Sequence, residues 1–263
     1  MIRKLLIFGF VFTGFVVSIA PTLRADEIAD MTRTISSMGY DTPSITTLRN
    51  ACDADALCVA RFLRDRIGDG AELVPYDAPA NKSRGWKKAG PAITSVTTNR
   101  GETLVLVLRR YDAVEALKAI NKTAVGLNRV VLDIRNMDAD TNMDAMRRMA
   151  AIFIGHRKRA FQVRYATGKN VDWRIPKPQT VAQFKALDVL VDRDTNGIGE
   201  TFALLLEKHA NATIKGVRTR GRGFILEQIP VTHGWALNVP RARLHIPGID
   251  LQKGVLPAVA LPN

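Results

Sequence analysis

The chain has 263 residues, of which 46% are hydrophobic and 24% charged, so it has the composition of a protein with a packed core and not of a chain too polar to fold. Its formal net charge of +13 favours anionic surroundings such as lipid headgroups, cell-wall or capsule polymers, or acidic proteins. Nucleic acid is disfavoured as a partner, because the basic residues are spread out and the densest cluster, 157–159, has no interleaved aromatic residues.

The first 25 residues have the pattern of a secretory signal peptide. Arg3 and Lys4 precede the apolar run 5–20, which is shorter than a membrane span requires, and the small residue Ala25 precedes an acidic start. Cleavage after Ala25 would leave a net charge of +10, because the segment removed from the +13 chain carries three basic residues and no acid. The alternative is an uncleaved N-terminal anchor. The pattern therefore predicts an exported protein, periplasmic or secreted.

Residues 26–90 predict a helical N-terminal region that ends in a linker. We expect a short helix over 26–38 and a second one over 57–67, where apolar residues recur at helical spacing before a Gly-Asp-Gly sequence. The stretch 75–91 is polar and contains Pro, Gly and Lys, which is typical of a connection between folded parts.

Cys52 and Cys58 are the only cysteines. In an exported chain we expect them to form a disulfide, which would stabilise the fold by about 2 kcal/mol because the loop is short. A catalytic or metal-binding cysteine pair is disfavoured, since no histidine lies near them in the sequence.

Beyond residue 90 the pattern changes to strands that alternate with helices. This alternation predicts an α/β fold built on βαβ crossovers, in a domain over 91–263. We expect the helical spacing of Met143 and Met146 to reflect packing in the core. The expected elements are strand 103–108, a helix marked by Val114, Leu117 and Ile120, strand 129–134, a helix marked by Met143, Met146, Ala150 and Phe153, strand 187–191, helix 200–209, strand 212–217, and a hairpin of strands 224–229 and 236–246.

The stretch 186–223 has the layout of a hydrolytic site but lacks a nucleophile. Its strand, polar turn and helix form the arrangement in which many hydrolases place a nucleophile, because the helix N-terminus offers N–H donors to an oxyanion. The turn reads Thr-Asn-Gly-Ile-Gly over 195–199, and a basic loop follows at 218–223. No serine occurs after Ser95 and no cysteine after Cys58.

Five motifs in order resemble the tail-specific (C-terminal-processing) serine peptidases. Residues 130–136 (Val-Val-Leu-Asp-Ile-Arg-Asn) are similar to the Leu-Asp-Leu-Arg-Asn strand of that family, and 190–200 to its elbow, which ends in Ser-Ala-Ser-Glu. The loop 216–223 (Gly-Val-Arg-Thr-Arg-Gly-Arg-Gly) is similar to Gly-Glu-Lys-Thr-Phe-Gly-Lys-Gly. The closing hairpin and the Gly-Val-Leu-Pro ending at 254–257 complete the match. The resemblance implies a crotonase-like α/β core with a C-terminal hairpin.

In that family a lysine activates a serine, and backbone N–H groups hold the oxyanion. Aligning the motifs places Gly197 at the nucleophile and Arg222 at the lysine. Glycine has no nucleophile, and a guanidinium stays protonated and cannot accept a proton from serine. The glycines of the oxyanion loop are replaced at 137–140, and the PDZ domain usual in the family has no counterpart in 26–95. The resemblance therefore predicts a catalytically inactive homologue that binds peptides or protein partners.

A competing hypothesis keeps an active peptidase with relocated catalytic residues. Thr195 or Thr201 would attack, and Asp192, Asp194 or His209 would act as the base. We disfavour it because a threonine and a carboxylate in a polar turn usually serve as capping groups.

The binding hypothesis assigns roles to Arg222, Glu200, Asp194 and Thr195. The first three are expected to form an ion-pair network in the vacated site, and Arg222 could hold a peptide's C-terminal carboxylate by bidentate hydrogen bonds. An extended peptide would add as a strand. A third hypothesis, from the net charge, is an accessory protein that binds an anionic envelope component.

We expect no cofactor and no metal. The histidines His156, His233 and His245 lack the spacing of metal ligands and are interpreted as surface or hairpin residues.

Overall fold

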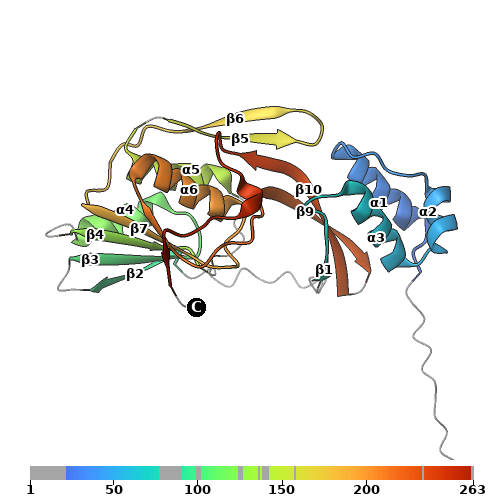
Figure 1. The fold of residues 1–263 in the computed structure, drawn as a ribbon, viewed down its shortest axis with the longest axis horizontal. Coiled ribbons are helices and arrows are strands. Elements are labelled where there is room, and N and C mark those ends of the chain that lie inside the picture. Colours follow the sequence, from blue (N-terminus) through green and yellow to red (C-terminus); the bar gives the residue numbers. More distant parts are fainter. Residues whose placement is uncertain are drawn as a thin grey trace, which may run out of the picture.

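The computed structural model describes residues 22–76, 91–98, 102–123, 127–135, 137, 142–156, 158–232 and 234–261. Figure 1 shows a larger part with two sheets and a smaller helical part at the N-terminal end. The helices are α1 (Ala25–Ser37), α2 (Ile45–Cys52), α3 (Ala56–Ile67), α4 (Ala113–Thr123), α5 (Met143–Ile154), α6 (Ile198–Ala210) and the short 3-10 helix η2 (Leu251–Lys253). The strands are β1 (Glu72–Tyr76), β2 (Ile93–Thr98), β3 (Thr103–Leu108), β4 (Arg129–Asp133), β5 (Lys158–Tyr165), β6 (Asn170–Ile175), β7 (Ala186–Val191), β8 (Thr213–Gly216), β9 (Phe224–Thr232), β10 (Gly234–His245) and β11 (Val259–Ala260).

The first sheet has the order β11-β8-β7-β4-β3-β2, and only β2 runs antiparallel to its neighbour. Helices α4 and α6 pack on this sheet, and α5 lies between them. The predicted βαβ crossovers are therefore confirmed, with β3 and β4 joined through α4 and β7 and β8 through α6. The mixed α/β fold is confirmed, and its description as crotonase-like stays a prediction.

Helix α4 differs in one detail from its expected apolar face. Val114 is 61% exposed, whereas Ala116 and Ile120 are buried against the sheet. The expectation for Val114 was wrong because the face of α4 that packs on the core includes residues 113, 116, 117 and 120, and Val114 lies beside this stripe. In α5, Met146 is fully buried and Met143 is half-buried against the same core, as their spacing predicts.

The second sheet has the order β1-β10-β5-β6, with β9 paired to the other side of β10. The predicted C-terminal hairpin is confirmed as β9 and β10, although the turn expected at His233 lies outside the described residues. Strands β1, β2, β5, β6 and β11, helix α2 and the 3-10 helix η2 were not predicted. Strand β5 buries Ala160, Phe161 and Val163, but two buried residues follow each other because its register against β6 shifts between Arg159 and Phe161, so the period-two pattern of a strand is broken.

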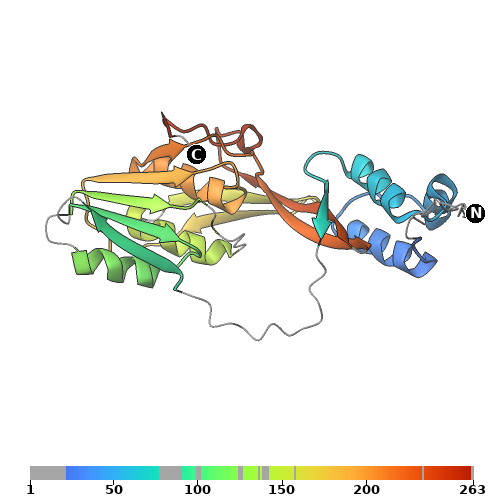
Figure 2. The ribbon, with the colours of Figure 1, turned by 90° about the horizontal axis from the view of Figure 1, so that it is seen from below.

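The N-terminal helices form a second core with the far end of the hairpin. Ile28, Ile35 and Leu63 are fully buried there, together with Leu237 and Val239 of β10. Figure 2 shows the hairpin reaching from the larger part to these helices. The expected boundary near residue 90 lies outside the described residues, but β1 joins the two parts because it pairs with β10.

Residues 1–21 of the expected signal peptide lie outside the described residues. The N–H of Leu23 donates to the carbonyl of Ala54 at 2.8 Å, and Leu23 packs on the second core, so cleavage after Ala25 would remove these contacts. Within the described ranges, no helix is long and apolar enough to cross a membrane.

The predicted disulfide between Cys52 and Cys58 is present and joins α2 to α3.

Candidate functional site

The turn between β7 and α6 has the backbone of a strained elbow. Gly197 is the N-cap of α6 with φ +47° and ψ −105°, in a region that residues with a side chain rarely adopt. A Cβ at this position would lie 3.2 Å from the carbonyl oxygen of Phe224 and 3.3 Å from that of Arg222. The two positions that the motif alignment equates with nucleophile and base are therefore adjacent, and glycine is the residue that fits without strain.

Glu200 connects the elbow to the basic loop. Its side chain is fully buried in the first turn of α6. One carboxylate oxygen accepts from the N–H of Gly197 at 3.0 Å, and the other accepts from the N–H of Gly221 at 2.8 Å and from the hydroxyl of Thr219 at 2.5 Å. Burial raises the pKa of the Glu200 carboxyl above its ordinary value, and these hydrogen bonds oppose that shift.

Thr219 extends the same network to the C-terminal segment. Its hydroxyl oxygen accepts from the N–H of Val255 at 2.8 Å, and its own N–H donates to the carbonyl of Val255 at 3.2 Å. The elbow, the basic loop and the Gly-Val-Leu-Pro ending are thus held by one buried group of polar contacts. If any of the hydrogen bonds to the Glu200 carboxylate were lost, its donor would be left as a buried polar group without a partner.

The expected ion-pair network of Arg222, Asp194 and Glu200 was wrong. The Arg222 guanidinium donates to the Glu72 carboxylate in β1 at 2.5 Å, and Asp194 pairs with Arg220 at 2.9 Å. Glu200 accepts only from uncharged side-chain and backbone donors. The network did not form because β1, which the sequence did not predict, brings a carboxylate to the outer side of the loop.

Thr195 lies at the elbow, and its hydroxyl is hydrogen-bonded to Asp192. The side chain is 5% exposed; its hydroxyl donates to Oδ1 of Asp192 at 2.9 Å and accepts from the Asp192 N–H at 3.1 Å. The same Oδ1 accepts from the N–H groups of Asp194 and Thr195. Because Oδ1 of Asp192 already accepts three hydrogen bonds within its own turn, Asp192 serves as a capping group.

The other residues of the active-peptidase hypothesis are not brought together. The Thr201 hydroxyl is buried and donates to the carbonyl of Gly197 at 3.0 Å. His209 lies at the opposite end of α6, in its last turn. Burial lowers the pKa of His209, and the positive charge of Lys208 lowers it further.

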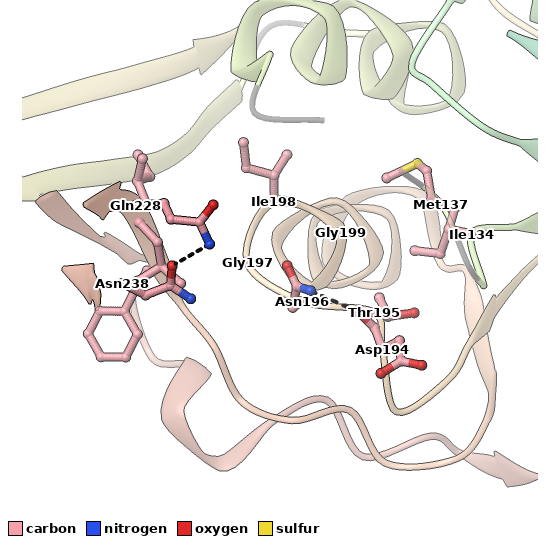
Figure 3. A pocket seen from close by; sticks show the side chains of 13 residues that line it. Ile134, Met137, Asp194, Thr195, Asn196, Gly197, Ile198, Gly199, Gln228 and Asn238 are labelled. Atoms are coloured by element: carbon pink, nitrogen blue, oxygen red, sulfur yellow. Dashed lines mark hydrogen bonds between the residues drawn. The ribbon is translucent and has the colours of Figure 1, made fainter. Parts of the chain in front are cut away.

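A cavity of about 410 Å³ lies beside Gly197, within the size range of ligand sites. Figure 3 shows side-chain amides on two sides of it, with Gln228 and Asn238 joined by a 3.2 Å hydrogen bond opposite the N-terminus of α6. Neither residue was predicted from the sequence, because only the register of β9 against β10 pairs them. The lining residues are Ile134, Met137, Asp194, Thr195, Asn196, Gly197, Ile198, Gly199, Phe224, Ile225, Leu226, Gln228 and Asn238.

Strand β9 forms one wall of this cavity with Phe224, Ile225, Leu226 and Gln228. Among the described strands it pairs with β10 alone, so its second edge has no strand partner there. A strand edge presents backbone N–H and C=O groups to an added chain. Apolar side chains, amides and a strand edge therefore meet at one place.

Across the described ranges, no group of three or more His, Cys, Asp or Glu side chains is placed to hold a metal ion.

The sequence model of peptidase family S41 matches residues 101–261, more than half of the chain. The chain belongs to peptidase family S41. The resemblance to the tail-specific serine peptidases is thereby confirmed. The matched part includes the elbow, the basic loop and the cavity, so all three lie within the S41 part of this chain. No curated protein matches the sequence.

Solved structures show the same fold at low sequence identity. A putative peptidase from Parabacteroides merdae has a TM-score of 0.62 at 10% identity, covering 90% of this chain and 89% of its own. A lipoprotein from Streptococcus agalactiae has a TM-score of 0.58 at 11% identity, covering 90% and 91%. The photosystem II D1 C-terminal processing protease has a TM-score of 0.52 at 23% identity over 65% of this chain. The S41 chain described here spans about half of that protease, 48%.

Glu200 makes stability depend on pH in a defined direction. Because its pKa is raised in the folded protein, its contribution is full below the ordinary value of 4.5 and is lost as the pH rises through the folded-state pKa. We expect Glu200→Gln, which is neutral, to remove this dependence from the free energy of unfolding, measured by urea denaturation across the acid and neutral range. Glu102→Gln, at an exposed glutamate, is the control. Equal pH slopes in the wild type and Glu200→Gln would contradict the assignment.

Proposed function

We propose that this S41 chain is exported and catalytically inactive, and that it binds an extended segment of a peptide or protein partner. The observation that carries the proposal is Gly197, which has the elbow backbone of a nucleophile position and no side chain. Loss of a nucleophile alone reduces an enzyme's rate by about 10⁴–10⁶-fold. At the neighbouring position, the Arg222 guanidinium cannot accept a proton and is paired with Glu72.

The cavity supports the binding part of the proposal. The edge of β9 offers main-chain hydrogen bonds to an added strand, which gives affinity without regard to sequence. Ile134, Ile225 and Leu226 offer apolar contacts to alternate side chains of that strand. Gln228 and Asn238 can both donate and accept, so they fit the amide groups of a peptide.

Export is the further part of the proposal. It rests on the basic and apolar pattern of residues 1–25 and agrees with a disulfide between Cys52 and Cys58, since disulfides persist in oxidising compartments. The mass of the protein recovered from the exported fraction checks it, and an uncleaved N-terminus would favour an anchor.

Catalytic inactivity predicts no turnover of unfolded casein. Gly197→Ser should also stay inactive, because Arg222 cannot take the proton and the new Cβ would crowd two carbonyl oxygens. The measurement is release of acid-soluble fragments over time. Turnover by the wild type that Thr195→Ala abolishes would establish the competing hypothesis of a relocated active site.

Binding at the β9 edge predicts that a charge in the cavity weakens it. We expect Leu226→Asp to reduce the affinity for fluorescently labelled unfolded casein by about tenfold or more, measured by anisotropy. Val114→Asp is the matched control, because Val114 is an apolar residue that is 61% exposed on α4. Thermal unfolding of both variants checks that they fold. Equal loss in the two variants, or no saturable binding by the wild type, would overturn the proposal.

The carboxylate-binding role of Arg222 stays a prediction, and it requires the guanidinium to exchange Glu72 for the ligand. Arg222→Ala should then weaken a valine- and alanine-rich peptide with a free C-terminus more than the same peptide amidated. Arg220→Ala, which removes the neighbouring pair with Asp194, is the control. If the wild type and Arg222→Ala bind the free peptide equally, Arg222 has no such role.

A further inference from the structure

The outer face of β5, β6 and β10 gathers arginines in register. Arg243 of β10 lies directly opposite Arg164 of β5, and Arg159 of β5 lies opposite Arg174 of β6. All four side chains are exposed, whereas the residues at 160, 163, 242 and 244, next to them along β5 and β10, are buried. Like charges directly opposite each other destabilise a strand pair. Asp172 offsets one of them, since it pairs with Arg159 at 2.7 Å.

Arg164 and Arg243 have no ion pair with an acidic side chain among the described residues. The Arg243 guanidinium lies over the Phe224 ring at 5.0 Å, and Nε of Arg164 donates to Oε1 of Gln162 at 2.7 Å. These contacts orient both guanidinium groups and leave most of their five N–H donors for another acceptor.

The two arginines line a cavity of about 180 Å³, together with His245. The segment around η2 closes it and contributes one acid, Asp250. The Asp250 carboxylate caps η2 through the N–H of Gln252 at 3.1 Å and lies 3.7 Å from the Lys253 ammonium. Asp250 is therefore already balanced by Lys253, and the two guanidinium charges remain uncompensated.

We propose that this cavity binds a phosphate monoester group. Two facing guanidinium groups match the charge of about −1.5 to −2 that a phosphate monoester carries at neutral pH. The three oxygens of the phosphate can accept from both planar guanidinium groups, whereas a single carboxylate has less charge and fewer acceptor oxygens. The cavity shares only Phe224 with the lining of the cavity at Gly197, so the inference does not depend on the proposed peptide binding. The site would be one defined place at which this positively charged chain binds an anion.

Inorganic phosphate tests the site in the full mature protein by calorimetric titration at constant ionic strength. Saturable binding is expected, with affinity reduced about tenfold or more in Arg164→Gln and in Arg243→Gln. Arg61→Gln removes the same charge at an exposed arginine of α3 and should bind as the wild type does. Without phosphate, the two site variants should melt no lower than the wild type, because each relieves a like-charge pair. Binding that chloride abolishes, or that all three variants weaken equally, would overturn the proposal.

A second readout is the titration of His245 followed by NMR. Burial lowers the pKa of His245, and the positive charges of Arg164 and Arg159 lower it further; Arg243 and Asp250 also face the cavity. A bound phosphate should raise that pKa, and an unchanged pKa at saturating phosphate would contradict the site. Co-sedimentation with phosphatidic acid vesicles separates the sources. Vesicle binding lost in Arg164→Gln and Arg243→Gln identifies a lipid headgroup, whereas phosphate binding without vesicle binding identifies a soluble phosphate ester.

Discussion

One buried carboxylate holds the site region of this protein together. Glu200 lies at the first turn of α6 and accepts from the elbow at Gly197, from Thr219 and from Gly221. Through Thr219 the same group reaches Val255 near the C-terminal end. A buried acceptor with this many donors cannot be lost without leaving several unpaired polar atoms. These contacts therefore hold the elbow in its geometry, and Gly197, which the proposed alignment equates with the family's nucleophile, has no side chain.

The scaffold and the chemistry of the site are physically separate. Gly197 has a positive φ. A residue with a side chain would be strained in this backbone conformation, whereas glycine adopts it at little cost. Arg222 does not line the cavity and pairs instead with Glu72, so it joins the basic loop to β1. Under the proposed alignment, the position of the family's lysine would thus contribute to the contact between the N-terminal region and the rest. The cavity beside Gly197 is left to apolar and amide groups, which suit binding.

Much of the fold was predictable because local patterns encode it. Strand β7 and helix α6 appear within two residues of their predicted bounds, since a largely apolar run and a 3.6-residue period are properties of neighbouring residues. Strand β5 was not predicted because a register shift between Arg159 and Phe161 interrupts its alternation of buried and exposed residues. Strand β6, which pairs with it, was not predicted either. Strand β1 is five residues long and contains a proline, so its pairing depends on β10, more than 150 positions away.

The sequence by itself determined the family resemblance, the disulfide pair and the absence of a nucleophile at Gly197, because each depends on which residues are present and in what order. Only the tertiary structure decided the partner of each charged side chain. Arg222 and Glu72 are separated by 150 positions, and Arg243 meets Arg164 only through strand register. The physical reason is that side-chain periodicity specifies which face of an element is buried. The choice among several carboxylates or arginines depends on which distant segments approach within hydrogen-bonding distance.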